Sequence, residues 1–132
     1  MTTYSEFVSG LAALVVDDVR LRLVAPPASL NAADLPALWV QLPQGESGPP
    51  IVFTGERWPV LRVDVVIAVI PVAQSTVEAS FAATLEMMDA LAEALAAARV
   101  GPAPLTWSIR QDVVAVAEAA YWAVVATVEV RG

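Results

Sequence analysis

The side chains that most often do chemistry at neutral pH are missing from this chain of 132 residues, which contains no His, no Cys and no Lys. His titrates near neutral pH, a thiolate is the readiest nucleophile, and Lys forms Schiff bases. Fourteen Asp and Glu, seven Arg and two Tyr remain to titrate. This composition favours a protein that acts through surface shape and assembly. We therefore expect neither an enzyme nor a bound cofactor.

Two groups of carboxylates have a spacing that a divalent cation could use. Asp17 and Asp18 are adjacent, and Glu86, Asp89 and Glu93 recur along one side of a helical segment. Adjacent residues on a helix point apart, so the Asp pair is better explained as the solvated end of a helix. The triplet is typical of a helix face in water. We therefore expect no metal site.

A third charged pattern lies on a strand, where Arg62 and Asp64 alternate onto the same face. Such residues can form ion pairs across strands or between subunits. They can equally mark the solvated edge of a core, and the sequence leaves both interpretations open. We keep Arg62 and Asp64 as candidate interface residues.

Charge and motifs argue against binding of nucleotides or of a nucleic-acid backbone. The net charge is −7 and the seven Arg are scattered along the chain, whereas backbone binding relies on clustered Lys and Arg. The six Gly form neither a phosphate-binding loop nor a GxSxG nucleophile elbow. An acidic protein can still lie beside DNA if its task is to avoid holding it.

The apolar content exceeds what one small core is expected to hide. Hydrophobic residues make up 58% of the chain, against a usual share of roughly 45–50%, and a domain this small leaves about a third of its unfolded-state surface in water. Contacts between subunits would bury the excess, although a GC-rich genome also raises Ala and Val. Four Trp fall on or beside strands: Trp39, Trp58, Trp107 and Trp122. Trp is frequent at interfaces, and Trp39 is the best candidate because it is out of phase with the apolar face of its strand.

The first half of the chain predicts a helix, a loop and a strand. Apolar residues recur at helical spacing over Tyr4–Val16, and Val19–Val24 fits either a short strand or the tail of that helix. Ala25–Pro36 is rich in Pro and predicts a loop, whereas Ala37–Leu42 alternates as a strand does. Pro43–Pro50 (PQGESGPP) has two Gly and three Pro, which predicts a flexible connection or a hairpin tip.

Trp58–Val72 predicts the central strand, and Ile51–Thr54 before it is also extended. One face of the central strand is continuously apolar and consists of Leu61, Val63, Val65, Ile67 and Val69. The other face starts polar at Arg62 and Asp64 and becomes apolar farther along. That change is expected if helices pack on the first face and a second body covers one end of the other.

The strongest helical pattern begins after a cap at Ser75 or Thr76 and continues to about Arg99. Its apolar stripe consists of Val77, Phe81, Leu85, Met88, Leu91 and Leu95. This periodicity predicts an amphipathic helix that lies on a sheet with the stripe facing inward.

Leu105–Gln111 and Tyr121–Arg131 alternate as strands. Asp112–Ala120 between them either extends both strands into a long hairpin or holds a short helical turn. The order of elements predicts a single α+β domain over residues 1–132. We expect a mostly antiparallel sheet of about four strands with helices packed on one face.

The sequence shows no targeting or membrane segment. The start lacks the basic and apolar regions of a signal peptide, and the most apolar run, Val63–Ala73, carries a charge and is too short to span a bilayer. We therefore expect assembly in the cytoplasm without a membrane partner.

Several short segments carry a family resemblance through their order and spacing. They are Ser29–Ala37 leading into the first strand, Thr54–Trp58 entering the long strand, Pro71–Thr76 between strand and helix, and Ala119–Val130 at the end. Together they resemble the tail terminator, or tail completion, proteins of long-tailed bacteriophages and related tail-like particles. The resemblance covers most of the chain, although each segment is short and degenerate.

The resemblance implies a tail-terminator-like sandwich and a structural role in the virion tail. Such a protein forms a ring, typically hexameric, that caps the tail tube, stops polymerisation and joins the tail to the head connector protein. Its partners would be further copies of itself, the tail tube protein and the connector, while DNA passes through without specific binding. Candidate interface residues are then Trp39, Gln44, Glu46, Trp58, Arg62 and Asp64, and Glu86, Asp89 and Glu93 would form an acidic lumen or a solvent face.

Three other interpretations stay open. A head–tail connector or another neck component shares this size and acidity. A small-molecule-binding or hydrolytic α+β domain would be a monomer or dimer with a polar pocket. A cellular scaffold or adaptor would have no link to a phage.

Overall fold

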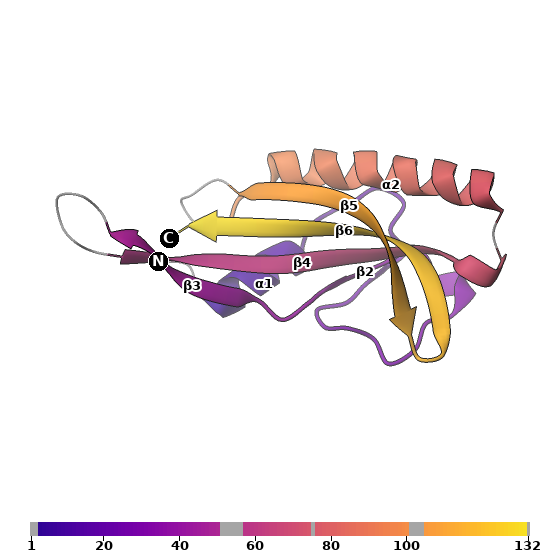
Figure 1. The fold of residues 1–132 in the computed structure, drawn as a ribbon, viewed down its shortest axis with the longest axis horizontal. Helices are drawn as coiled ribbons and strands as arrows, with labels where there is room; N and C mark the ends of the chain where they lie inside the picture. Colours follow the sequence, from indigo (N-terminus) through magenta and orange to yellow (C-terminus); the bar gives the residue numbers. More distant parts are fainter. Residues whose placement is uncertain (1–2, 51–56, 75, 101–104, 132) are drawn as a thin grey trace.

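The computed structural model describes residues 3–50, 57–74, 76–100 and 105–131. Over these residues the chain forms one sheet of six strands, two α-helices and two short 3-10 helices, so the α+β prediction is confirmed (Figure 1). The elements are α1 (Tyr4–Ala12), β1 (Leu21–Arg22), η1 (Ala32–Asp34), β2 (Ala37–Val40), β3 (Gln44–Pro50), β4 (Arg57–Pro71), η2 (Val72–Gln74), α2 (Val77–Ala97), β5 (Thr106–Val116) and β6 (Ala119–Arg131).

The sheet is organised around β4, its longest strand. The strand order is β1-β2-β4-β6-β5, and β3 pairs with the same edge of β4 as β2 does, farther toward the start of β4. Every pairing is antiparallel except that of β1 with β2. The two ends of the sheet are therefore different, with β5 on one side and β1 and β3 on the other.

The expectation of about four strands was wrong because two segments were not recognised as strands. Val19–Val24 contains β1, which has only two residues. The Gly- and Pro-rich segment Pro43–Pro50 contains β3, although we expected a flexible connection or a hairpin tip. Edge strands tolerate Pro. A Cβ at Gly45 would collide with the Tyr4 hydroxyl, so the missing side chain lets α1 begin directly over β3.

The C-terminal strands settle the alternatives left open for Asp112–Ala120. Both strands continue through this segment, and β5 pairs with β6 from Thr106 opposite Glu129 to Val116 opposite Ala119. Ala117 begins the two-residue turn with a φ of 56°, the sign that the first position of a type II′ turn requires. Figure 1 shows the hairpin following β4 and then bending sharply before the turn.

The first helix is shorter than the periodicity predicted. The Thr3 side chain caps α1 by accepting a hydrogen bond of 3.1 Å from the Glu6 amide. The helix ends at Ala12 instead of Val16, before two Val and two Asp that are poor residues for a helix C-terminus. Neither helix in the described residues combines the length and hydropathy needed to cross a membrane.

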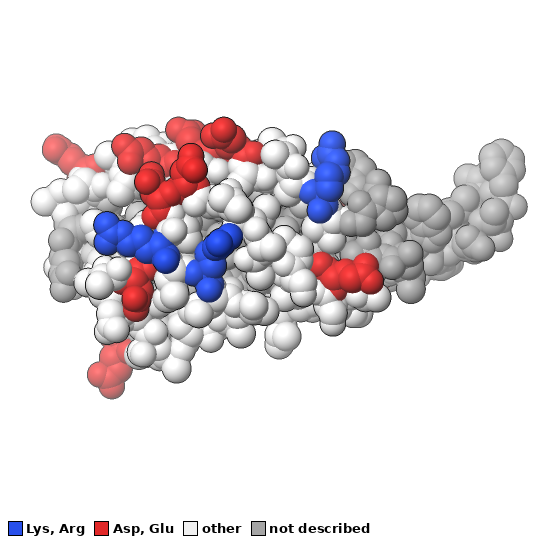
Figure 2. Space-filling view, turned by 180° about the vertical axis from the view of Figure 1, so that it is seen from behind, with Lys and Arg blue, Asp and Glu red and all other residues white. Residues whose placement is uncertain are grey.

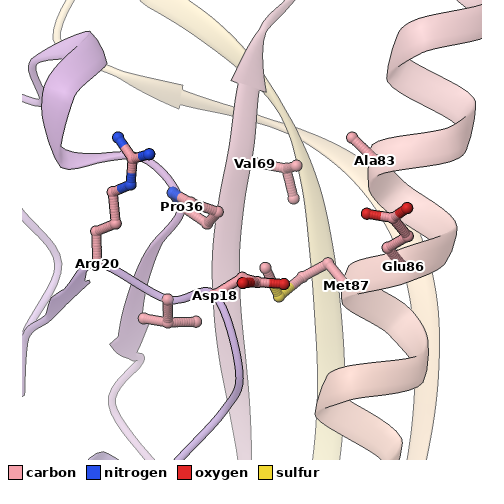
Figure 3. Close-up of a pocket in the computed structure, with 8 residues that line it drawn as sticks. Asp18, Arg20, Pro36, Val69, Ala83, Glu86 and Met87 are labelled. Carbon is pink, nitrogen blue, oxygen red and sulfur yellow. The ribbon is translucent and has the colours of Figure 1, made fainter.

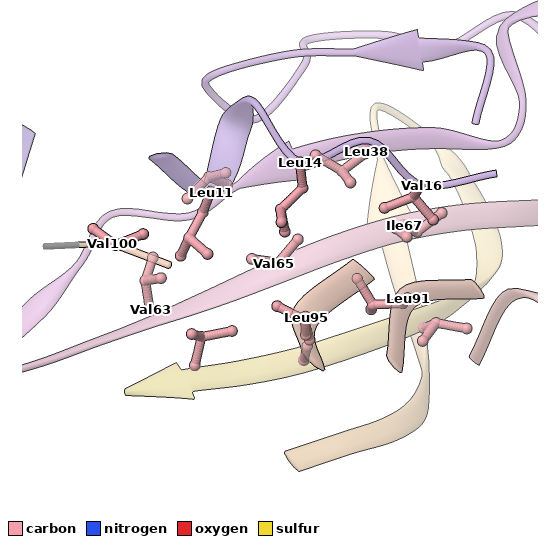
Figure 4. Close-up of a cluster of buried hydrophobic side chains, with 14 of the residues drawn as sticks. Leu11, Leu14, Val16, Leu38, Val63, Val65, Ile67, Leu91, Leu95 and Val100 are labelled. Carbon is pink, nitrogen blue, oxygen red and sulfur yellow. The ribbon is translucent and has the colours of Figure 1, made fainter. Parts of the chain in front are cut away.

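Side chains from both helices share one core with the predicted apolar face of β4 (Figure 4). All five residues of that face belong to this core, and Leu61, Val63, Val65 and Ile67 are at most 2% exposed. Phe7 and Leu11 enter from α1, and Met87, Leu91 and Leu95 enter from α2. The alternation read from β4 thus correctly identified the main core.

A second core lies on the opposite face of the sheet, at the end of β4 that becomes apolar. It consists of Leu35, Ala37, Trp39, Val66, Ala68, Val116, Tyr121, Ala123 and Val125. The loop before β2 and the bent end of the β5–β6 hairpin cover it, and the Tyr121 hydroxyl donates a hydrogen bond of 3.4 Å to the Leu30 carbonyl. The second body expected over this end is therefore the chain itself.

The helix α2 packs with a different stripe from the one its periodicity predicted. Its buried residues are Ser80, Thr84, Met87, Leu91 and Leu95. Leu91 and Leu95 agree with the prediction, whereas Val77, Phe81 and Leu85 are 84%, 66% and 46% exposed. The N-terminal half of α2 is rotated so that two hydroxyl residues face the sheet and three large apolar residues do not.

Candidate interface surfaces

Four of the predicted interface residues lie together on the polar part of the open sheet face. Gln44 lies opposite Arg62, and Arg62 lies opposite Glu129 on the next strand. Glu46 follows on β3 and Asp64 on β4, both on the same face as Arg62. Strand alternation brought these side chains together, as the sequence predicted for Arg62 and Asp64.

The first set of charges joins β3, β4 and β6. Arg62 donates a hydrogen bond of 2.9 Å from Nη2 to Oε2 of Glu129. The same nitrogen lies 3.7 Å from Oε1 of Glu46. One guanidinium therefore lies between two carboxylates that come from different neighbouring strands.

The second set joins β4, β5 and β6 one register farther along. Nη2 of Arg110 lies 3.7 Å from Oδ2 of Asp64, and Nε of Arg110 lies 3.9 Å from Oδ2 of Asp112. Nη1 of Arg110 donates a hydrogen bond of 3.0 Å to the Thr127 hydroxyl. Thr127 in turn donates a hydrogen bond of 2.8 Å to Oδ1 of Asp64. No signal in the sequence paired Thr127 or Glu129 with β4.

This network contributes little to the stability of the fold. Its members are 24% to 65% exposed, and exposed ion pairs contribute little free energy. The hydrogen bond to Glu129, together with the charge of that carboxylate, raises the pKa of the Arg62 guanidinium. When folding raises the pKa of a base, the resulting stabilisation of the fold is fully present at pH values below the unfolded-state pKa. It is lost only as the pH rises through the folded-state pKa. Its contribution is therefore constant from neutral pH to strong alkali.

Trp39 does not lie on a surface, and this corrects the best single interface candidate from the sequence. It is 2% exposed and belongs to the second core. The sequence correctly predicted that Trp39 points to the face of β2 opposite Leu38 and Val40. That face, however, is covered by the chain's own loop and hairpin. Trp58 lies at the start of β4, and its side chain is outside the part of the chain that the structure describes.

The predicted acidic face of α2 is exposed to solvent. Glu86, Asp89 and Glu93 are all exposed, as is Glu78 in the first turn. Figure 2 shows acidic side chains gathered along the border of the molecule where α2 lies. Among the described residues, no group of three or more Asp and Glu side chains is arranged to hold a metal ion.

A pocket of about 490 Å³ lies between α2 and the segment after α1 (Figure 3). Asp18 and Arg20 line one wall, Glu86 and Met87 line the other, and Val69 of β4 lies between them. The lining carries charges of both signs, but neither a thiol nor an imidazole, since the chain has no Cys or His.

Exposed apolar residues of α2 and of the outer strand β5 lie on the same side of the helix-bearing face. Ala83 and Glu86 line the pocket on the α1 side, and Phe81 and Leu85 project roughly from the opposite side of the helix. They therefore face the β5 side, where α2 contacts β5. Trp107 and Val113 of β5 are also exposed, and they pair with Val128 and Trp122 on the helix-bearing face of the sheet. We call Val77, Phe81, Leu85, Trp107 and Val113 the α2–β5 patch.

The backbone beside this patch is an open sheet edge. Along the described residues β5 pairs with β6 on one side, and no strand pairs with its other side. The strand is 11 residues long and contains no Gly or Pro. Long unprotected edges readily pair with another chain, so natural proteins usually shorten, charge or cover them. The exposed groups of β5 are thus suited to contact a further strand.

A second apolar surface lies at the other end of the sheet, beside α1. A hollow of about 420 Å³ is lined by Tyr4, Ser5, Val8, Leu42 and Pro43, and we call it the α1 hollow. Tyr4 is 51% exposed and Leu42 is 89% exposed. These residues belong to α1 and to the connection between β2 and β3, on the edge of β4 opposite β6 and β5.

Comparison with known proteins gives this chain no family. It matches no family model, and no curated protein matches it.

Proposed function

We propose that this chain is a tail terminator: a structural protein that caps the tail tube as a ring, typically of six subunits, stops polymerisation and joins the tail to the head connector. The proposal includes a tail-terminator-like sandwich and a place in the virion tail after assembly in the host cytoplasm. It rests on the resemblance of four segments along the sequence, together with the surfaces of the folded chain.

The observation that carries the proposal is the apolar surface left at both ends of the sheet. Five large apolar side chains of the α2–β5 patch are exposed, and the α1 hollow lies at the opposite end. A monomeric protein rarely exposes large contiguous apolar surfaces, which usually mark contact sites. A subunit with neighbours on both sides, as in a ring, would cover both surfaces.

The distribution of charge supports a channel through which DNA passes without binding. The chain carries a net charge of −7, and Glu86, Asp89 and Glu93 are exposed along α2. The two Arg of the open face are each paired with carboxylates, so they are not free to hold phosphates. An acidic ring would repel the DNA backbone, and this exposed face of α2 is our candidate for its lumen.

The decisive experiment is negative-stain microscopy of particles assembled without this protein. A tail terminator predicts overlong tails without heads, because polymerisation of the tube is no longer stopped. A connector or neck protein predicts tails of normal length that fail to join heads, and this result would replace our proposal with the runner-up. Particles of normal length and attachment would contradict both.

A further inference from the structure

We propose that the α2–β5 patch of one copy covers the α1 hollow of the next copy, so that each subunit uses two different surfaces. This inference rests on the proposed ring and assigns the residues that would form its contacts. It concerns this chain's own surfaces, because they are unlike one another and lie at opposite ends of one sheet.

The position of the two surfaces identifies a second copy as the occupant. When two copies join through unlike surfaces, the pair still has one free surface of each kind. Further copies can therefore add in the same way, and the chain of copies closes into a ring when the rotation between neighbouring subunits divides a full turn evenly. Two unrelated partners would be needed to cover the same two surfaces on a single subunit. A further copy of this chain covers both with one type of contact.

The patch has a projecting aromatic side chain, and the hollow has room to receive one. Phe81 projects from α2 with 66% of its surface exposed, and the α1 hollow of about 420 Å³ is lined by Tyr4, Val8, Leu42 and Pro43. Aromatic side chains inserted into pockets dominate many protein interfaces. Beside each surface lies a strand, β5 or β3, whose outer edge pairs with no strand in the described residues. The two edges would therefore meet when the patch covers the hollow.

The absence of Cys from the chain makes a cross-linking test unusually clean. We would introduce E78C and S5C in the same full-length chain and treat it with a short bismaleimide, alone and with tail tubes. Glu78 lies one helical turn from Phe81, and Ser5 lines the α1 hollow. Both positions are exposed, so the variants are expected to fold while Phe81 and Leu42 stay in place. A head-to-tail contact predicts a ladder of covalent oligomers up to the size of the wild-type ring. A mixture of the two single variants should give only cross-linked dimers, because each carries one reactive surface.

Matched controls separate this inference from its alternatives. Val24 is 62% exposed and belongs to neither surface, so V24C combined with S5C should give no ladder. Dimers from E78C alone would mean that two patches meet each other, and would overturn the inference. Absence of a ladder while wild-type rings are visible by microscopy would overturn it and leave the proposed function intact. Absence of both ladder and rings, with tail tubes present, would contradict the inference and the proposed function together.

Discussion

The two halves of α2 differ in whether their large apolar residues are buried or exposed. In the C-terminal half, Leu91 and Leu95 are at most 2% exposed and pack into the main core. In the N-terminal half, Ser80 and Thr84 face the sheet, while Phe81 and Leu85 are exposed on the flank of the helix toward β5. A helix that served only the core would bury its largest apolar side chains along its whole length.

Core packing and exposed apolar surface are therefore separated along one helix. The C-terminal half supplies packing, and the N-terminal half holds apolar side chains in a fixed position beside β5. If this division is correct, substitutions in the first set should change the free energy of unfolding. Substitutions in the second set should change association and leave folding nearly unaffected.

The largest effect is expected from Leu91→Ala. Leu91 is fully buried in the main core, so the substitution removes packed atoms and leaves a cavity, at a cost of about 2–5 kcal/mol. The free energy of unfolding, measured by urea denaturation under conditions where the chain is monomeric, checks this value. If Leu91→Ala lowered the free energy of unfolding by only about 0.5 kcal/mol, as expected for an exposed residue, the two halves of α2 would not differ.

A smaller effect of opposite sign is expected from Thr84→Val. The Thr84 hydroxyl is buried and has no hydrogen-bond partner among the residues that the structure describes. Val keeps the branched shape and removes the unpaired polar group, which should stabilise the fold by about 1 kcal/mol. The same denaturation measurement tests it, and a clear destabilisation would mean that the hydroxyl is satisfied in solution.

The smallest effect on stability is expected from Leu85→Ala. Leu85 is 46% exposed, and surface substitutions usually change stability by about 0.5 kcal/mol or less. Its effect should instead appear as weaker association, measured as the concentration at which assembled protein dissociates in sedimentation velocity. Leu91→Ala is the matched comparison, since both remove the same atoms from the same helix. A loss of stability as large as that of Leu91→Ala would contradict the division.

The main core was predictable because one face of β4 is apolar without interruption. Apolar residues stand at every second position from Leu61 to Val69, as a buried strand face requires, and all five are in that core. The cap at Thr76 was also one of the two predicted positions, and its hydroxyl accepts a hydrogen bond from the Ala79 amide.

The stripe of α2 and the strand β3 were not predictable from local pattern. Residues at positions 77, 81 and 85 share helical spacing with the core residues that follow, so periodicity alone cannot tell which flank of the helix meets the sheet. The strand β3 forms in a Gly- and Pro-rich segment because the free edge of β4 is available to it, a tertiary effect that overrides composition.

The candidate interface was only partly predictable for the same reason. Arg62 and Asp64 were identified by alternation, whereas their partners Glu129 and Arg110 depend on the order of strands in the sheet. Trp39 was judged by phase alone, and phase cannot show that a distant loop and hairpin will cover its face. Which residues are exposed can therefore be predicted only when the fold is known. The buried face of a strand such as β4 can be predicted from its own sequence.

The assembly surfaces are tested by comparing the molar mass of the wild-type chain with that of Phe81→Glu by size-exclusion chromatography with light scattering, alone and with tail tubes. We predict an oligomer for the wild type, and a monomer with an unchanged circular dichroism spectrum for the variant. A wild-type protein that stays monomeric under both conditions, or a variant that assembles as the wild type does, would contradict the claim that these exposed side chains join neighbouring copies.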